Sequence, residues 1–244
     1  MTNGTRPSRH AKGALIIGEG TLLDEWIVIE SGVVSLCTGI AGTRVAVATL
    51  WRGDLLGHGS PLGKERARFD VRALGEVTTL RLPAEQAASL LGEREQARLA
   101  AATDERLQDQ IFMRLAGNGL QRLVSVLATL ATALSASAPR GHASSQTLAL
   151  PLVQSCLGEL SGLSRRQAWI YLGQLAESGW ARTSRTRILL DGIEAWLALP
   201  AEVAREGLAC IATLELCTAT LERLSRRLPL HAVAPRAWPL AVDE

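Results

Sequence analysis

The amino-acid sequence predicts an α+β protein, with antiparallel β-structure in its N-terminal part and helices in its C-terminal part. Two observations carry this prediction. Between residues 13 and 83, short apolar and β-branched runs alternate with Gly and Asp, which is typical of strands joined by tight turns. From Pro83 to about Ser137, the chain is instead rich in Ala, Leu, Glu, Gln and Arg, which favour helices.

The N-terminal runs are short and closely spaced, and turn residues such as Gly32 and Gly53-Asp54 separate them. This pattern predicts an antiparallel β-roll of the jelly-roll type. The runs are Trp26–Ile29, Val33–Leu36, Arg44–Leu50, Val71–Leu74 and Val77–Leu82.

The helical region divides at Gly117-Asn-Gly119, so we expect one long helix before this break and another after it. Pro83 suits the first turn of the long helix. One face of that helix carries Leu99, Leu107, Ile111 and Leu115. Such a face fits either an intramolecular core or an interface between two copies of the chain, and the spacing does not distinguish these two interpretations.

Composition limits the classes of protein that fit. The chain has 244 residues and is 47% hydrophobic, which suffices for one large or two medium domains and excludes global disorder. The net charge of +2 leaves nucleic-acid binding open, because a local basic patch can be hidden in the sum. The polar N-terminus lacks the apolar segment of a secretion signal.

The longest apolar stretch, Leu123–Ala138, contains Thr and Ser and falls short of the ~20 residues that span a bilayer. We expect a buried helix there, no membrane partner and a cytoplasmic location. The cysteines are far apart and form no C-x-x-C pair, which favours reduced thiols. They are Cys37, Cys156, Cys210 and Cys217.

Ser135–Thr147 is small and polar and contains Pro and Gly, which indicates a linker. Beyond it, Leu157 and Leu160 predict a short amphipathic helix that stops at Ser161-Gly162. Ser164-Arg-Arg-Gln167 then has the pattern of a capping box and starts a second helix.

The second helix has two distinct faces. Ala168, Tyr171, Leu172 and Leu175 recur at helical spacing and form the expected buried face. The opposite face carries Arg165, Arg166, Trp169, Ile170 and Gly173. After Gly179, two short strands around a polar, Arg-rich turn predict a wing.

A short helix, a tight turn, a second helix and an Arg-rich hairpin, in this order, are the elements of a winged helix-turn-helix. Such a motif places the N-terminus of its second helix in the major groove of duplex DNA. Arginines there can donate two hydrogen bonds to guanine, and wing arginines can contact phosphates. A helical hairpin with a solvated basic face is the alternative. The expected DNA-binding residues are Gln154, Ser155, Ser164, Arg165, Arg166, Gln167, Trp169, Ile170, Arg182, Arg185 and Arg187.

The sequence resembles the Crp/Fnr family of bacterial transcription regulators. Its C-terminal match runs from Leu157 through Trp180 and the hairpin to Asp191. The N-terminal match is a cyclic-nucleotide-binding-like β-roll over Ile27–Val33, Leu50–Gly57 and Val71–Leu74. Together they cover roughly residues 13–190.

The resemblance implies a homodimer joined along the long helix, a palindromic DNA site, and RNA polymerase as a further candidate partner. It also implies a roll that senses a small molecule. The domains expected on this basis are a β-roll sensor (1–92), dimerisation and connecting helices (93–137), a winged helix-turn-helix (148–191) and a helical C-terminal extension (192–244).

The roll departs from members that bind cyclic AMP, which carry an acidic residue and an Arg-Ser pair where His58-Gly-Ser-Pro61 and Ala67-Arg-Phe69 stand here. This disfavours cyclic AMP. The effector pocket is expected at Gly57, His58, Ser60, Arg66 and Arg68. No cysteine cluster for an iron–sulfur centre occurs, and Cys37 with His58 is the sole candidate haem pair in the roll.

The recognition helix also departs from the family pattern. Arg165 matches the first contacting arginine, but Arg166 replaces a common Glu and Ile170 replaces a second arginine. A site unlike the usual one is therefore expected, and Trp169 and Ile170 either touch thymine methyl groups or pack on a protein surface. Cys156 lies where oxidation would disturb DNA binding, although an ordinary buried thiol is the default.

Residues 193–228 predict a further helical segment that caps the dimer, packs on the wing or recruits a partner. Two alternatives to an effector-controlled DNA-binding regulator remain: a module whose winged helix docks on protein, and an enzyme. The enzyme is disfavoured because the sequence shows no catalytic motif, no evident cofactor site, and no metal spacing among its histidines. These are His10, His58, His142 and His231.

Overall fold

The computed structural model describes residues 7–23, 25–40, 42–56, 65–137, 146–152, 154–184 and 187–227. The chain forms two compact units, Met1–Gln108 and Asp109–Glu244. The boundary between them lies inside the long helix α1 (Ala84–Leu115).

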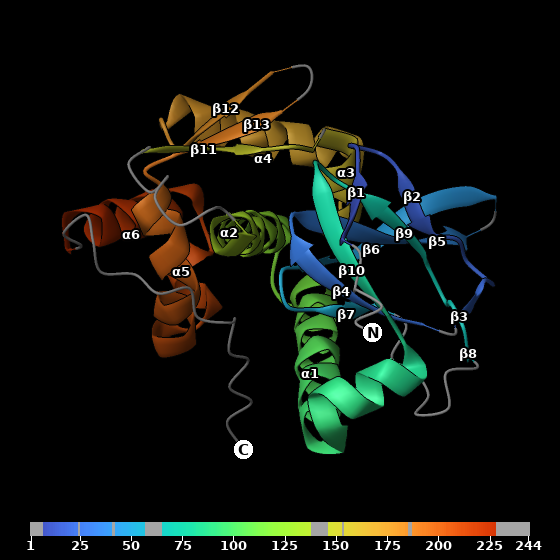
Figure 1. The fold of residues 1–244 in the computed structure, drawn as a ribbon. Helices are drawn as coiled ribbons and strands as arrows, with labels where there is room; N and C mark the ends of the chain where they lie inside the picture. The colour runs from blue at the N-terminus through green and yellow to red at the C-terminus, as the bar shows by residue number, and fades with distance from the viewer. Residues whose placement is uncertain are drawn as a thin grey trace. The chain divides into compact units, whose positions relative to one another are not determined.

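The N-terminal unit is an antiparallel β-roll (Figure 1), as predicted. Its described strands form two four-stranded sheets, of order β1-β10-β4-β7 and β2-β9-β5-β6, and a two-stranded sheet β3-β8. The strands are β1 (Pro7–His10), β2 (Leu15–Ile17), β3 (Leu22–Leu23), β4 (Glu25–Ser31), β5 (Val33–Ile40), β6 (Thr43–Trp51), β7 (Leu55–Leu56), β8 (Glu65–Arg66), β9 (Asp70–Ala73) and β10 (Val77–Pro83).

Apolar side chains of both sheets meet in one core, which includes Ile29, Val34 and Leu50. The tight turn before β5 requires Gly32, which has a φ of 88° and whose Cβ, if present, would lie 2.3 Å from the carbonyl oxygen of Glu76. Any other residue there would clash with backbone, so this glycine fixes the turn that carries the chain from β4 in one sheet to β5 in the other.

A buried ionic cluster holds α1 to the roll. Asp54 is 1% exposed, accepts the backbone N–H of Trp51 at 2.8 Å and pairs with Arg106 of α1. The Arg106 guanidinium also lies 4.2 Å from the centre of the Trp51 ring. The backbone N–H of Leu55 donates to the Thr103 hydroxyl at 3.1 Å. Because these contacts join α1 to the turn between β6 and β7, the helix is anchored there.

Helix α1 departs from the prediction at its start. Pro83 is the last residue of β10 and not part of the helix, and Gly92 breaks the helical backbone with a φ of 67°. Leu99 and Leu107 pack against the roll. Ile111 and Leu115 are 52% and 77% exposed. The predicted apolar face therefore divides into an intramolecular part and an uncovered part.

The C-terminal unit is built around α2 (Gly119–Ser137), which begins at the last residue of the predicted break and is buried along most of its length. By length and composition, Gly119–Ala136 would pass as a membrane-spanning segment, but 67% of it is buried in the structure. That burial is typical of a core helix, as the sequence predicted.

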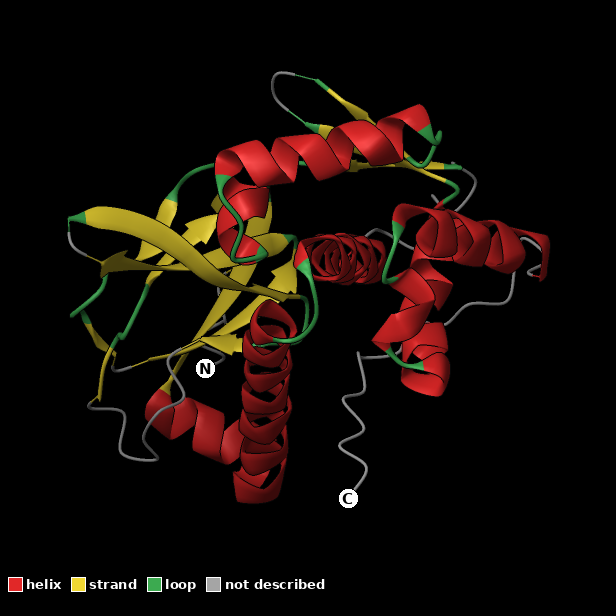
Figure 2. Ribbon diagram, turned by 180° about the vertical axis from the view of Figure 1, so that it is seen from behind, coloured by secondary structure: helices red, strands yellow, loops and turns green. Residues whose placement is uncertain are grey.

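The remaining elements of the C-terminal unit are three strands and several helices (Figures 1 and 2). Three strands form one sheet of order β11-β13-β12, of which the sequence predicted the two wing strands but not β11. Gly207, with a φ of 75°, divides the single C-terminal helical segment that was predicted. The elements are β11 (Thr147–Leu150), α3 (Gln154–Leu160), α4 (Arg165–Glu177), β12 (Ala181–Thr183), β13 (Ile188–Asp191), α5 (Ile193–Glu206), the 3-10 helix η1 (Leu208–Ile211) and α6 (Leu214–Arg227).

The C-terminal extension packs inside its own unit. Helix α5 lies against α2 and α6. Glu202, 7% exposed, pairs with Arg205 at 2.6 Å and Arg223 at 2.8 Å, which joins α5 to α6. Burial raises the pKa of the Cys217 thiol on α6 to about 12. This thiol is a core group and not a reactive one.

Candidate nucleic-acid interface

The turn between α3 and α4 is tight and internally bonded. The buried hydroxyl of Ser161 donates to the carbonyl oxygen of Leu157 at 2.6 Å, and Gly162 adopts a φ of 62°. The backbone N–H of Leu163 donates to the carbonyl oxygen of Gly158 at 2.8 Å. These bonds stop α3 sharply, as the Gly signal predicted, and set the angle at which α4 begins.

Ser164 caps α4. Its hydroxyl accepts the backbone N–H of Gln167 at 3.2 Å, and the Gln167 side-chain oxygen accepts the backbone N–H of Ser164 at 3.1 Å. Both bonds of the predicted capping box are present. The cap fixes the first turn of the helix, which carries Arg165 and Arg166.

The inner face of α4 is anchored in the C-terminal unit. Ala168, Leu172 and Leu175 are fully buried, and Tyr171 is partly buried. The Tyr171 ring packs against the start of α2, where a Cβ on Gly119 would lie 2.8 Å from it. The predicted buried face is confirmed, and it holds the opposite face outward.

That outward face consists of Arg165, Arg166, Trp169, Ile170 and Gly173. Trp169 is 62% exposed and Ile170 40% exposed, and both arginines are exposed. A Cβ added at Gly173 would have no atom within 4 Å. The first turn of α4 contains no acidic residue. The face is therefore basic at the helix N-terminus and apolar one turn further on.

The wing strands β12 and β13 follow α4 and pair in antiparallel register (Figure 2). Arg182, predicted as a phosphate contact, donates from Nε and Nη2 to the Asp191 carboxylate at 2.7 and 2.6 Å. These hydrogen bonds hold the pKa of Asp191 below its ordinary value. Sequence reasoning missed this pair, because the partners come from different strands. Arg187 is exposed.

Arg185 lies outside the described residues, as do the side chains of Gln154 and Ser155, whose backbone forms the start of α3. Cys156, considered as a redox switch, is partly buried on α3.

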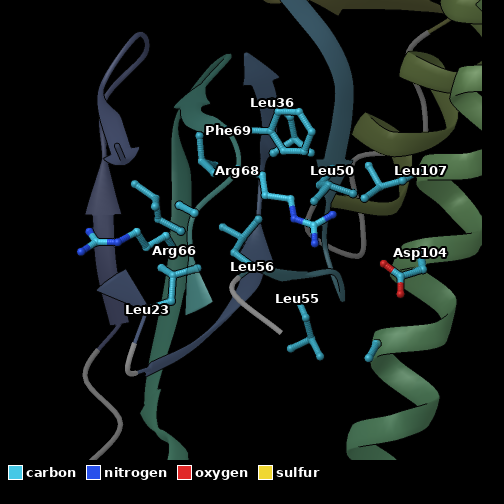
Figure 3. Close-up of a pocket in the computed structure, with 14 residues that line it drawn as sticks. Leu23, Leu36, Leu50, Leu55, Leu56, Arg66, Arg68, Phe69, Asp104 and Leu107 are labelled. Carbon is cyan, nitrogen blue, oxygen red and sulfur yellow. The ribbon is translucent and has the colours of Figure 1, made fainter. Parts of the chain in front are cut away.

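The roll contains a cavity of about 450 Å³. Its lining is mainly apolar and includes Leu36, Leu50 and Phe69, together with Leu107 from α1. Figure 3 shows Arg68 projecting between Leu50 and Leu56, toward the helix that carries Asp104. The cavity therefore combines an apolar wall with one inward-facing cation and one α1 carboxylate.

Arg66, the other described residue of the expected effector pocket, also lines this cavity. The Arg66 guanidinium points away and donates to the carbonyl oxygen of Gly20 at 2.8 Å. Gly57, His58 and Ser60 lie outside the described residues. Cys37 is buried, with its sulfur 3.5 Å from the Ser35 hydroxyl. Among the described residues, no group of three or more His, Cys, Asp or Glu side chains is placed to hold a metal ion.

A β-roll, a long helix and a winged helix-turn-helix follow one another along this chain, and this order can be compared with proteins of known structure. Residues 7–94 match the cyclic nucleotide-binding domain family. The chain is similar to a CRP-family transcriptional regulator from Thermus thermophilus, at a TM-score of 0.66 and 20% identity, covering 84% of this chain and 100% of that one.

A CRP/FNR-family regulator from the same organism gives a TM-score of 0.62 at 19% identity, covering 85% and 98% of the two chains. FixK2 from Bradyrhizobium japonicum gives 0.60 at 18%, covering 76% and 91%. No curated protein sequence matches significantly. Residues 7–94 thus form a cyclic nucleotide-binding-type domain, and the chain has the fold of the Crp/Fnr regulators, as the resemblance implied.

Proposed function

We propose that this protein is a sequence-specific, DNA-binding transcription regulator. The observation that carries the proposal is the exposed N-terminal turn of α4, where the capping box presents Arg165 and Arg166 and the turn itself contains no acidic side chain. A helix held in this way can enter a major groove and offer guanidinium groups to guanine O6 and N7. The similar solved structures named above are transcriptional regulators, which supports the same class.

The regulator acts as a homodimer. The end of α1 carries Ile111, Phe112 and Leu115, which are 52%, 53% and 77% exposed. Three large apolar side chains on adjoining turns of one helix are costly to leave in water and suit pairing with a second copy. A two-fold dimer would bind two half-sites about one DNA turn apart.

The roll cavity is the effector site in this proposal. Its apolar wall and the inward-facing Arg68 suit an effector with an apolar body and an anionic group, in place of cyclic AMP. Because Asp104 and Leu107 of α1 line the same cavity, a bound effector would bear directly on that helix. Regulation of transcription places the protein in the cytoplasm, with RNA polymerase as a partner and with no enzymatic step.

An alternative function is a protein-interaction module that docks through the same face. The exposure of Trp169 and Ile170 favours it, since large apolar side chains are typical of protein interfaces. The two functions differ in salt dependence, because phosphate contacts make DNA affinity fall steeply as salt rises.

Selection from a pool of random DNA duplexes tests the proposal. The expected result is enrichment of a palindromic site, protected in a footprint by the wild-type protein and not by the Arg165→Ala/Arg166→Ala variant. Arg52→Ala/Arg94→Ala, which removes two exposed arginines from the other unit, is the matched control. No enrichment, together with DNA binding that ignores both α4 substitutions, would refute the proposal.

A further inference from the structure

The outward face of α4 changes character along the helix. Its first turn presents Arg165 and Arg166, whereas the next turn presents Trp169 and Ile170, which the described part of the chain leaves exposed. Gly173 continues the face with no side chain at all. Among large apolar residues of the described chain, Trp169 and Ile170 are the ones exposed beside a cationic helix N-terminus.

Packing does not explain this face. Glycine inside a helix costs about 1 kcal/mol relative to alanine, and at Gly173 there is open space for a Cβ. The helix is held from its other side by Ala168, Leu172 and Leu175, so the outward apolar residues add nothing to the core. Their composition suits a partner that approaches the helix closely, and the adjoining arginines favour a polyanion over a neutral protein surface.

We infer that Ile170, together with Trp169, determines sequence specificity by reading the C5-methyl group of a thymine in the major groove. This inference rests on the proposed function. Ile170 has no group that can donate to guanine or accept from cytosine, so a G·C edge buried against it would lose hydrogen bonds to water without replacement. Thymine is the base that presents a methyl group there.

The placement of the thymine follows from helix geometry. Ile170 follows Arg166 by four residues, which is about 6 Å along a helix that rises ~1.5 Å per residue. Base pairs are spaced ~3.4 Å apart. The thymine is therefore expected within about two base pairs of the base contacted by the arginines. Two effects therefore contribute to the selectivity: contact with the methyl group favours thymine, and the loss of hydrogen bonds to water disfavours G·C pairs.

The test uses the full-length protein and the duplex enriched from random DNA. Each thymine of a half-site is replaced singly by deoxyuridine, which lacks the methyl group and keeps base pairing, and affinity is measured by fluorescence anisotropy. We expect one or two replacements to weaken binding by about fourfold, the worth of one buried methyl group. In Ile170→Ala and in Trp169→Ala, the deoxyuridine replacements should no longer weaken binding.

Leu216→Ala is the matched control, since Leu216 is 47% exposed on α6 and its removal should leave the deoxyuridine effect unchanged. If no thymine responds, or if the response persists in both Ile170→Ala and Trp169→Ala, the inference is overturned. The proposed function survives that result as long as an enriched site still depends on Arg165. If random DNA yields no preferred site at all, both fail.

Discussion

Replacing Ser164 separates the stability of α4 from its capacity to bind DNA. In Ser164→Ala the backbone N–H of Gln167 loses its acceptor, and the Gln167 side-chain oxygen loses the hydrogen bond that the Ser164 hydroxyl donates at 2.9 Å. The backbone N–H of residue 164 still donates to that oxygen. Loss of a hydroxyl cap typically costs about 1 kcal/mol. For a unit the size of residues 109–244, that is a fall in melting temperature of about 3 °C.

Ser164→Asp should behave differently. Aspartate caps helices as well as serine does, so the melting temperature should stay near that of the wild type. The new carboxylate beside Arg165 should nevertheless weaken DNA binding at low salt, because it adds a negative charge to the helix end that approaches the polyanionic DNA. Calorimetry and anisotropy on both variants give the two quantities.

Ser225 provides the control pair, since it is exposed on α6 and its hydroxyl donates to the carbonyl oxygen of Glu222 in the same helix. Ser225→Ala and Ser225→Asp should leave DNA affinity unchanged. The reasoning about the cap is refuted if Ser164→Ala melts with the wild type, or if Ser164→Asp loses as much stability as Ser164→Ala.

Three further outcomes follow from single contacts. Gly173→Ala should raise the free energy of unfolding by up to about 1 kcal/mol in a urea titration, since the added methyl group meets open space; a loss of stability would contradict this. The pKa of Asp191 is lowered by Arg182, so its stabilising contribution is present above the ordinary aspartate pKa and is lost as pH falls through the lower folded value. Asp191→Asn should thus flatten the acid limb of a melting-temperature profile, and an unchanged limb would count against the pair. Cys217, with its pKa raised to about 12, should resist iodoacetamide at pH 8.5 until denaturant is added, and rapid labelling of the native protein, read by mass spectrometry, would show that it is not buried.

The features that sequence reasoning located are those fixed by neighbours in the chain. The capping box joins Ser164 to Gln167 three residues away, and the buried face of α4 repeats with helical period. The alternation of apolar runs and turns in the N-terminal part likewise predicts strands. Each of these depends on local spacing, which a single sequence displays directly.

Contacts between distant segments were harder to predict. Strand β11 exists because Thr147–Leu150 pairs with β13, some forty residues later, and nothing local in that segment signals it. The apolar residues of α1 share one periodicity, yet Leu107 packs on the roll and Leu115 is 77% exposed. Which of them finds a partner depends on where the roll ends, and helical spacing holds no information on that point.

The central claim is that the outward face of α4 recognises DNA through its first-turn arginines. The most direct measurement compares affinity for the enriched duplex with affinity for a scrambled duplex, at one salt concentration, in three proteins. These are the wild type, Arg165→Ala/Arg166→Ala, and Arg52→Ala/Arg94→Ala, which removes the same charge from exposed sites in the other unit. We expect the first and third proteins to share a high specificity ratio. In the α4 variant the ratio should fall by about tenfold or more, the worth of one good guanine contact. An equal ratio in all three proteins would contradict the claim.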